Sequence, residues 1–171
     1  MSLLYFTYGS NLCDARVKGR APGAAALWPA WLPGFELRWH KRSLDGSGKC
    51  SIIPSTSSDS VVHGVLYRLH LASKSKLDQV EGLGLGYSEV TVRVHGEASV
   101  SEALTYVASP THIDESLQPY SWYKRLVVVG AAAQGLPPDY IDSLRFVESR
   151  PDPDVGRAAR HLADLPCDRS V

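Results

Sequence analysis

The stretch Leu3-Leu4-Tyr5-Phe6-Thr7-Tyr8-Gly9-Ser10-Asn11-Leu12 carries the strongest local signal in this chain of 171 residues. Its apolar and aromatic run from Leu3 to Tyr8 ends at Gly9, a pattern typical of a strand that stops at a turn. Asn11 is a residue type that caps helices, and Asp14 suits a first helical turn. The stretch therefore predicts a strand, a glycine turn and a helix that runs from Asn11 to about Lys18.

Outward from this stretch, the sequence predicts short strands with helices at intervals. Alternating or β-branched apolar runs predict strands at 35–41, 51–54, 61–69, 87–95 and 102–108. Helical spacing predicts helices at 72–80, 121–133 and 139–148, with Ser73 and Ser121 as caps. Residues 20–34 are rich in Pro, Gly and Ala, so they are expected to be irregular. The pattern indicates an α+β fold with a small mixed or antiparallel, β-barrel-like sheet and flanking helices, although an open sheet fits it as well.

The composition excludes two classes of protein. Eighteen Lys and Arg residues balance eighteen Asp and Glu residues, and 44% of the chain is hydrophobic. Disordered chains combine low hydrophobicity with high net charge, and nucleic-acid-binding domains usually carry a basic excess. We therefore expect a globular domain that buries a core and does not bind nucleic acid.

The sequence also bears on compartment and metals. It begins with neither the basic start nor the apolar run of a signal peptide, and its longest apolar stretch, 126–133, is far shorter than the roughly 20 residues of a membrane-spanning helix. Cys13, Cys50 and Cys167 show no C-x-x-C spacing, and the His residues show no H-x-x-x-H spacing. We expect a cytoplasmic protein with free thiols, no membrane contact and no metal site.

The first candidate site is the loop that follows the opening strand. Backbone N–H groups at the start of a helix have no intrahelical acceptor, so those of Gly9, Ser10 and Asn11 could hold an anion. Gly9 would also let a ligand approach the backbone closely. Ser10 does not lie in a G-x-S-x-G turn, so we do not expect it to be a nucleophile. A simple capped turn fits the same residues.

The second candidate is Glu81, in the segment Leu77-Asp78-Gln79-Val80-Glu81-Gly82. Glu81 falls at the predicted C-terminal end of a helix, where the negative partial charge disfavours an ionised carboxylate. A carboxylate placed there accepts a proton more readily, which suits a general base. Asp78 lies three residues earlier on nearly the same face and could add to this effect. An exposed Glu at a fraying helix end fits the pattern too.

Taken together, these segments resemble the γ-glutamylcyclotransferase-like family. Residues 3–12 resemble its Y-F-x-Y-G-S-N-L opening, and 77–82 resemble its L-D-x-x-E-G segment. A third similar region comprises Tyr123-Lys124-Arg125, Gly130, Gly135-Leu136-Pro137 and Tyr140. The resemblance spans residues 3–148, so we expect one domain over 1–148 and a tail or short surface helix over 149–171.

The resemblance implies an enzyme that needs no cofactor. Members of the family cyclise a γ-glutamyl group onto its own α-amine, which releases 5-oxoproline and an amine or amino acid. Glu81 matches the catalytic Glu of the family, and Tyr123 matches a Tyr that bonds the substrate. The opening signature adds the expected substrate-binding residues Tyr8, Gly9, Ser10, Asn11 and Leu12.

Two other hypotheses remain open at this stage. The same scaffold could bind a γ-glutamyl or other carboxylate metabolite without catalysis. It could also cyclise a specialised γ-glutamylated intermediate of a biosynthetic pathway. Neither residues 41–60 nor residues 109–121 contain a pattern that identifies the leaving amine, and the sequence does not indicate an oligomeric state.

Overall fold

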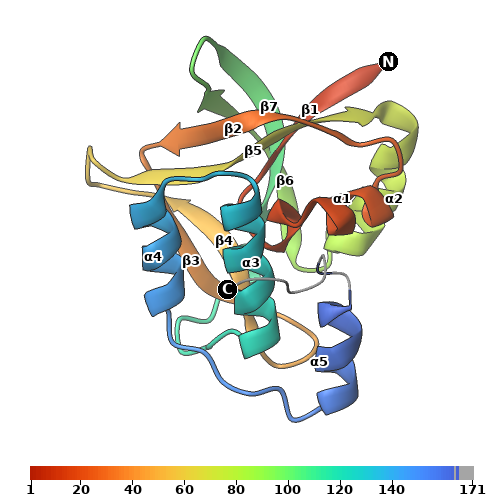
Figure 1. Cartoon of the computed structure of the whole chain (residues 1–171), viewed down its shortest axis with the longest axis vertical. Helices are drawn as coiled ribbons and strands as arrows, with labels where there is room; N and C mark the ends of the chain where they lie inside the picture. Colours follow the sequence, from red (N-terminus) through yellow and green to blue (C-terminus); the bar gives the residue numbers. More distant parts are fainter. Residues whose placement is uncertain (164, 166–171) are drawn as a thin grey trace.

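The strands of the fold lie in two groups (Figure 1). They are β1 (Ser2–Thr7), β2 (Ala25–Pro33), β3 (Phe35–Arg42), β4 (Gly48–Pro54), β5 (Val61–His70), β6 (Tyr87–His95) and β7 (Val100–Ala108). Within residues 1–163 and 165, which this computed structural model describes, β1-β5-β2-β6-β7 close into a barrel and β3 pairs with β4. The expected α+β fold with a barrel-like sheet is confirmed.

Antiparallel pairing builds most of the barrel, and one parallel contact closes it. β1 pairs with β5 from Ser2↔His70 to Thr7↔Val65, whereas its parallel ladder with β7 has one described pair, Tyr5↔Leu104. The first strand therefore lies between two partners and is held on both sides. Its end at Thr7 fixes the point from which the loop of residues 8–13 leaves the barrel.

The prediction of an irregular segment at 20–34 is wrong for β2. This strand pairs with β5 from Ala25↔Arg68 to Pro33↔Val61, with a register shift between Ala26 and Trp28. Its other neighbour, β6, meets it only at Trp31↔His95. A proline is tolerated in a strand at a bulge or where few ladder bonds are made. The closed barrel also requires a second neighbour for β5, and the local composition of residues 20–34 does not show that they fill this place.

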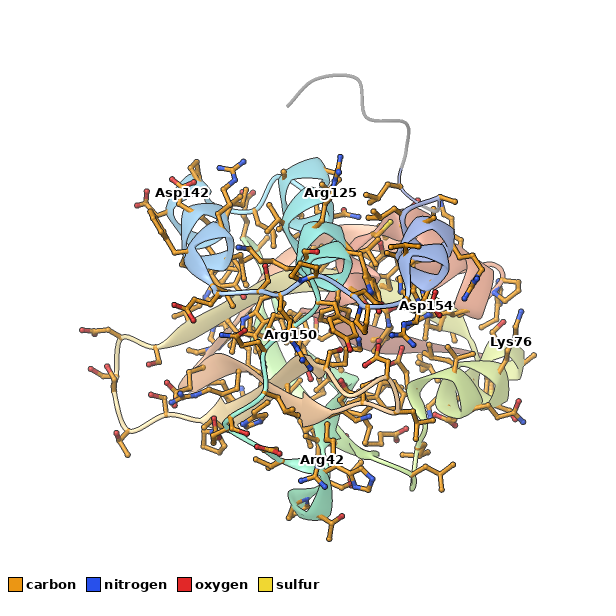
Figure 2. All side chains as sticks on the ribbon, turned by 90° about the horizontal axis from the view of Figure 1, so that it is seen from below. Arg42, Lys76, Arg125, Asp142, Arg150 and Asp154 are labelled. Atoms are coloured by element: carbon orange, nitrogen blue, oxygen red, sulfur yellow. The ribbon has the colours of Figure 1, made fainter. Side chains whose placement is uncertain are left out.

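Helices cover one side and one end of the sheets. They are α1 (Asp14–Arg20), α2 (Lys74–Glu81), α3 (Ser121–Ala133), α4 (Pro138–Phe146) and α5 (Val155–Leu162), with 3-10 turns at Ser10–Leu12, Leu71–Ser73 and Pro110–His112. Figure 2 shows α3, α4 and α5 on one side of the sheets, marked by the labels Arg125, Asp142 and Asp154, with Arg42 on the opposite side. Residues 164 and 166–171, which include Cys167 and the end of the expected tail, lie outside the described residues.

The expected helix caps are wrong in their details. Tyr120, not Ser121, is the N-cap of α3, and the Ser121 N–H donates to the Arg150 carbonyl at 2.8 Å. Ser73 occupies the N-cap position of α2, but its hydroxyl donates to the Pro22 carbonyl at 2.8 Å. Because both groups find partners far away in the sequence, the local cap pattern does not predict their bonds.

The opening helix also differs from its prediction. A 3-10 turn at Ser10–Leu12 precedes α1, and Cys13 is the N-cap of α1, while Asp14 lies in its first turn as expected. The Asn11 side chain makes no cap bond and instead donates to the Tyr5 hydroxyl at 2.7 Å. Asn11 is therefore not a helix cap but a buried polar group with long-range partners.

Gly130 of α3 lets that helix pack directly on the loop of residues 8–13. A Cβ at Gly130 would lie 2.7 Å from the Cys13 nitrogen and 2.7 Å from the Leu12 carbonyl carbon. Such distances are well inside van der Waals contact, and the neighbouring atoms are backbone that cannot swing away. The absence of a side chain at this position therefore sets how closely α3 can approach the loop.

Replacing Gly130 by Ala is expected to lower the free energy of unfolding by about 1–3 kcal/mol, because α3 and the loop must move apart. Urea unfolding measures this change. Gly19→Ala in α1 is the matched control, since nothing lies within 4 Å of its Cβ position. The control should be neutral or stabilising by about 0.5–1 kcal/mol. Equal effects of the two substitutions would contradict the close approach.

Candidate active site

Three side chains from separate segments meet where α1 and α2 end. Glu81 Oε1 accepts from Arg20 Nη1 at 2.7 Å and from Asn11 Nδ2 at 2.8 Å. The same Arg20 nitrogen donates to Asn11 Oδ1 at 2.8 Å. Figure 1 shows α1 and α2 beside each other, which brings the two helix ends together. Arg20 and Glu81 form an ion pair whose side chains are 18% and 13% exposed.

The local sequence explains why these two charged residues stand at helix ends. Gly82 adopts a left-handed conformation, with φ 70°, and ends α2 directly after Glu81. The negative end of α2 opposes the charge of Glu81, whereas Arg20, at the end of α1, is favoured by the dipole of its own helix. The guanidinium of Arg20 thus stabilises the carboxylate that the helix end alone disfavours.

The two oxygens of Glu81 differ in their surroundings. Oε1 receives both hydrogen bonds, from Asn11 and Arg20. Within residues 1–163 and 165, Oε2 has no hydrogen-bond partner. One oxygen therefore orients the carboxylate, and the other remains available to a bound molecule.

Glu81 lines a narrow inner hollow of about 40 Å³ at the end of the barrel. The predicted site residues that also line it are Tyr8, Gly9, Ser10, Asn11 and Tyr123. Leu12 is placed differently, because its side chain is fully buried in the core beneath the loop. The structure thus brings together both candidate motifs and Tyr123, although they are far apart in the sequence.

Gly9 and Tyr123 form one wall of the inner hollow. A Cβ at Gly9 would lie 3.1 Å from Cys50 Cβ and 3.3 Å from Tyr123 Oη. The Cys50 N–H donates to that phenol oxygen at 3.0 Å, and the Tyr8 hydroxyl donates to the Tyr106 carbonyl. Burial raises the pKa of Tyr8 and Tyr123 and raises the pKa of the Cys50 thiol to about 12. These groups are therefore uncharged at neutral pH.

A larger outer hollow of about 220 Å³ adjoins the inner one. The two share Ser10, Glu81, Tyr87 and Tyr123. The outer hollow is lined by many charged side chains, which are Arg16, Arg20, Lys41, Lys49, Asp45 and Glu81. It is thus a charged entrance, whereas the inner hollow has Glu81 as the only acidic or basic lining residue among the described residues.

Lys49 is held in the wall of the outer hollow. Its ammonium donates to Asp45 at 2.7 Å and lies 4.5 Å from the centre of the Trp122 ring and 4.7 Å from that of Tyr123. Burial lowers the pKa of Lys49, while Asp45 opposes this effect. Lys49 is therefore a fixed part of the wall, with its charge already compensated.

Helix α5 supplies a further part of this wall. The His161 ring stacks on Trp122 with 4.0 Å between ring centres. Trp122 Nε1 donates to the fully buried carboxylate of Asp152 at 2.7 Å, and Arg157 of α5 donates to both of its oxygens, at 2.7 and 2.5 Å. The sequence pattern did not indicate any part for this segment in the site, because its contacts depend on residues 30 positions away.

Lowering the pH should release α5. Hydrogen bonds from Arg157, the largest cause, together with those from Trp122 and the Asp154 N–H, hold the pKa of Asp152 well below its usual range. A lowered folded-state pKa stabilises the fold above the unfolded value, about 3.9, and the contribution is lost as the pH falls below it. We expect Asp152→Asn to lower Tm at pH 7, and this difference to shrink below about pH 4. A Tm difference independent of pH would contradict this assignment. Asp142→Asn, at an exposed pair with Arg145, is the control.

Comparison with known proteins decides the family. A sequence model of the AIG2-like family matches residues 61–144. The human protein named gamma-glutamylcyclotransferase is 30% identical over 168 residues, which covers 96% of this chain and 87% of that protein. The chain belongs to the γ-glutamylcyclotransferase family. The mouse protein of the same name is 29% identical over the same shares.

A solved structure supports the same γ-glutamylcyclotransferase assignment. The structure titled gamma-glutamyl cyclotransferase superposes with a TM-score of 0.81 at 28% identity, over 88% of this chain and 90% of that one. The expectation of an enzyme of this type is therefore confirmed. The boundary expected at residue 148 stays a prediction, as do the roles of the individual site residues.

Two features of the described residues bear on metals and membranes. No group of three or more His, Cys, Asp or Glu side chains within 1–163 and 165 is arranged to hold a metal ion. Over the same residues, no helix combines the length and apolar character that crossing a membrane requires.

Proposed function

We propose that the protein cyclises a γ-glutamyl compound to 5-oxoproline and releases the attached amine, with Glu81 as general acid and base. The observation that carries this proposal is the oriented carboxylate of Glu81. Its Oε1 is held by Arg20 and Asn11, and Oε2 lacks a partner among the described residues. A base fixed in this way, beside the loop of residues 9–11, suits a proton transfer within a small hollow.

The reaction needs little beyond proton transfer and positioning. Glu81 takes a proton from the α-ammonium group, and the amine attacks the γ-carbonyl carbon to close a five-membered ring. Glu81 then gives this proton to the departing nitrogen as the original carbon–nitrogen bond breaks. The ring nitrogen loses its second proton to the released amine, which leaves as an ammonium ion, and Glu81 is a carboxylate again. The nucleophile and the carbonyl belong to one molecule, so tethering supplies several kcal/mol of the rate enhancement. No atom is oxidised and no water is consumed, so the step requires no cofactor.

Other site residues would stabilise the charge that develops on the substrate. Backbone N–H groups of Gly9, Ser10 and Asn11 are suited to the oxyanion and to the substrate α-carboxylate. The Tyr123 hydroxyl accepts from the Cys50 N–H and lines the inner hollow, so it is suited to contact the glutamyl group. Tyr8 would line the pocket. The cytoplasmic location and the role of Leu12 stay predictions.

A substrate panel tests the proposal. The protein is incubated with γ-glutamyl amino acids, γ-glutamyl amines and glutathione, and the released 5-oxoproline is measured. Release from at least one group is expected. Binding of these ligands, seen as a rise in Tm without any release, would replace the proposal with a non-catalytic binding module. Release confined to a specialised γ-glutamylated amine would indicate a cyclotransferase of a biosynthetic pathway.

A further inference from the structure

Lys41 of β3 lies at the boundary of the site without an acidic partner. Its Nζ is 4.7 Å from the centre of the Tyr87 ring, and it lines the outer hollow together with Glu81 and Tyr87. A Cβ at Gly86 would lie 2.9 Å from this Nζ, so the side chain packs against the turn that follows α2. The position is defined on two sides by neighbouring segments.

Two ion pairs of the outer hollow do not include Lys41, and a further lining cation, Arg16, contacts His161 at 3.4 Å. Arg20 pairs with Glu81, and Lys49 pairs with Asp45. Lys41 makes no ion pair with any residue of 1–163 or 165. Burial lowers the pKa of Lys41, and the charges of Glu81 and Asp45 oppose that effect without contacting it. A partly buried cation without a counter-charge is unfavourable unless a ligand supplies one.

The two hollows also divide a γ-glutamyl substrate into halves. Glu81 must reach both the attacking amine and the departing nitrogen, so the bond that breaks lies where the hollows meet. If the loop of residues 9–11 holds the glutamyl end at the inner hollow, the departing half points toward the outer hollow, which Tyr87 and Lys41 line.

We propose that Lys41 binds a carboxylate of the leaving group and thereby selects γ-glutamyl amino acids or peptides over γ-glutamyl amines. This inference rests on the proposed cyclotransferase function. Lys41 acts as a specificity-determining residue and takes no part in the proton transfers. The ammonium group of Lys41 would donate hydrogen bonds to the leaving carboxylate, and each group would serve as the counter-charge of the other.

The test compares two substrates that differ in one charge. γ-Glutamyl-alanine carries the leaving-group carboxylate, and γ-glutamyl-alaninamide has a neutral amide in its place. We measure kcat and KM for 5-oxoproline release from both, with the wild type and with Lys41→Met. Methionine keeps an unbranched chain over Tyr87 and removes the charge. Comparing the variant with the wild type on each substrate cancels the different leaving abilities of the two amines.

We expect Lys41→Met to affect the two substrates differently. Lys41→Met should lower kcat/KM for γ-glutamyl-alanine about 10- to 100-fold, mainly through KM, because a hydrogen bond to a charged group is lost. The amide substrate should change less than about 3-fold. Lys41→Arg should restore much of the preference for the carboxylate. Arg42→Met is the matched control, because Arg42 is the next residue, is exposed and pairs with Asp114, and neither of the two lines a hollow. Figure 2 shows Arg42 on the side of the sheets opposite to α3, α4 and α5.

Other outcomes would distinguish a failure of the Lys41 inference from a failure of the proposed function. Equal losses on both substrates would place Lys41 at the glutamyl end and overturn the inference. No loss on either substrate would show that Lys41 contacts neither half, and would overturn it too. If the wild type releases 5-oxoproline from no γ-glutamyl compound, the proposed function itself fails and the inference falls with it.

Discussion

Glu81→Gln should lower kcat for 5-oxoproline release about 10³-fold, because general acid–base catalysis is lost while the side-chain shape is kept. A Gln oxygen can still accept the hydrogen bonds of Arg20 and Asn11, so the fold should be retained. The substitution leaves the largely buried charge of Arg20 without a counter-charge, so the free energy of unfolding should fall by about 1–3 kcal/mol. Steady-state kinetics and urea unfolding measure the two effects.

The matched control for this prediction is Glu89→Gln. Glu89 of β6 pairs with Lys74 of α2 and lines neither hollow. Its substitution should leave kcat within about 2-fold. Full turnover by the Glu81→Gln variant would show that another group carries the proton. Loss of turnover together with unfolding would leave a purely structural role, which the urea data would reveal.

Arg20→Met is expected to lower kcat about 10- to 100-fold, since the carboxylate of Glu81 loses its charged partner and part of its fixed orientation. The substitution removes hydrogen bonds to two residues, Glu81 and Asn11. Both ends of the ion pair are largely buried, so the free energy of unfolding should fall by about 1–3 kcal/mol. Kinetics on the best substrate of the panel and urea unfolding measure both effects.

Lys18→Met provides the comparison within the same helix. Lys18 pairs with Asp14 at 2.6 Å, but its side chain is 57% exposed, and such surface pairs contribute about 0–1 kcal/mol. This variant should keep its activity. Arg20→Lys should keep part of the activity through its charge while losing the geometry that spans two partners. Activity of Arg20→Met equal to that of the wild type would show that Asn11 alone orients Glu81.

The sequence predicts the elements whose side-chain pattern is local. The alternation in β6 and the apolar spacing of α3 both gave elements close to those observed. The prediction missed strand β2 because Pro29 and the small residues around it weaken the strand pattern. The pairing of β2 with β5 depends on the closure of the barrel, which the local sequence does not show. The side chains of Asn11 and Ser73 do not make the expected cap bonds for a related reason, since tertiary partners compete for these polar groups, and the N-cap of α3 is Tyr120 instead of Ser121.

The candidate site was predictable in part. Glu81 and the loop of residues 8–11 carry recognisable motifs, and the fold places them around one hollow. Arg20 was missed because its partners are 61 and 9 residues away. The sequence did contain a signal for Arg20. It is a basic residue at the end of the helix that follows the loop motif, and a long side chain at that position can reach back to the loop. Lys41 and α5 had no such signal, because their neighbours at the site come from distant segments.

The division of the site into two hollows has an evolutionary consequence. The inner wall comes largely from the opening strand, its loop and β7, whereas the outer wall draws on residues 41–49 and on α5. Under the proposed function, substitutions in the outer segments change which amine departs without moving the atoms that close the ring. Descendants of one ancestral cyclotransferase could therefore acquire new substrates by altering only these peripheral segments, with the ring-closing apparatus inherited unchanged.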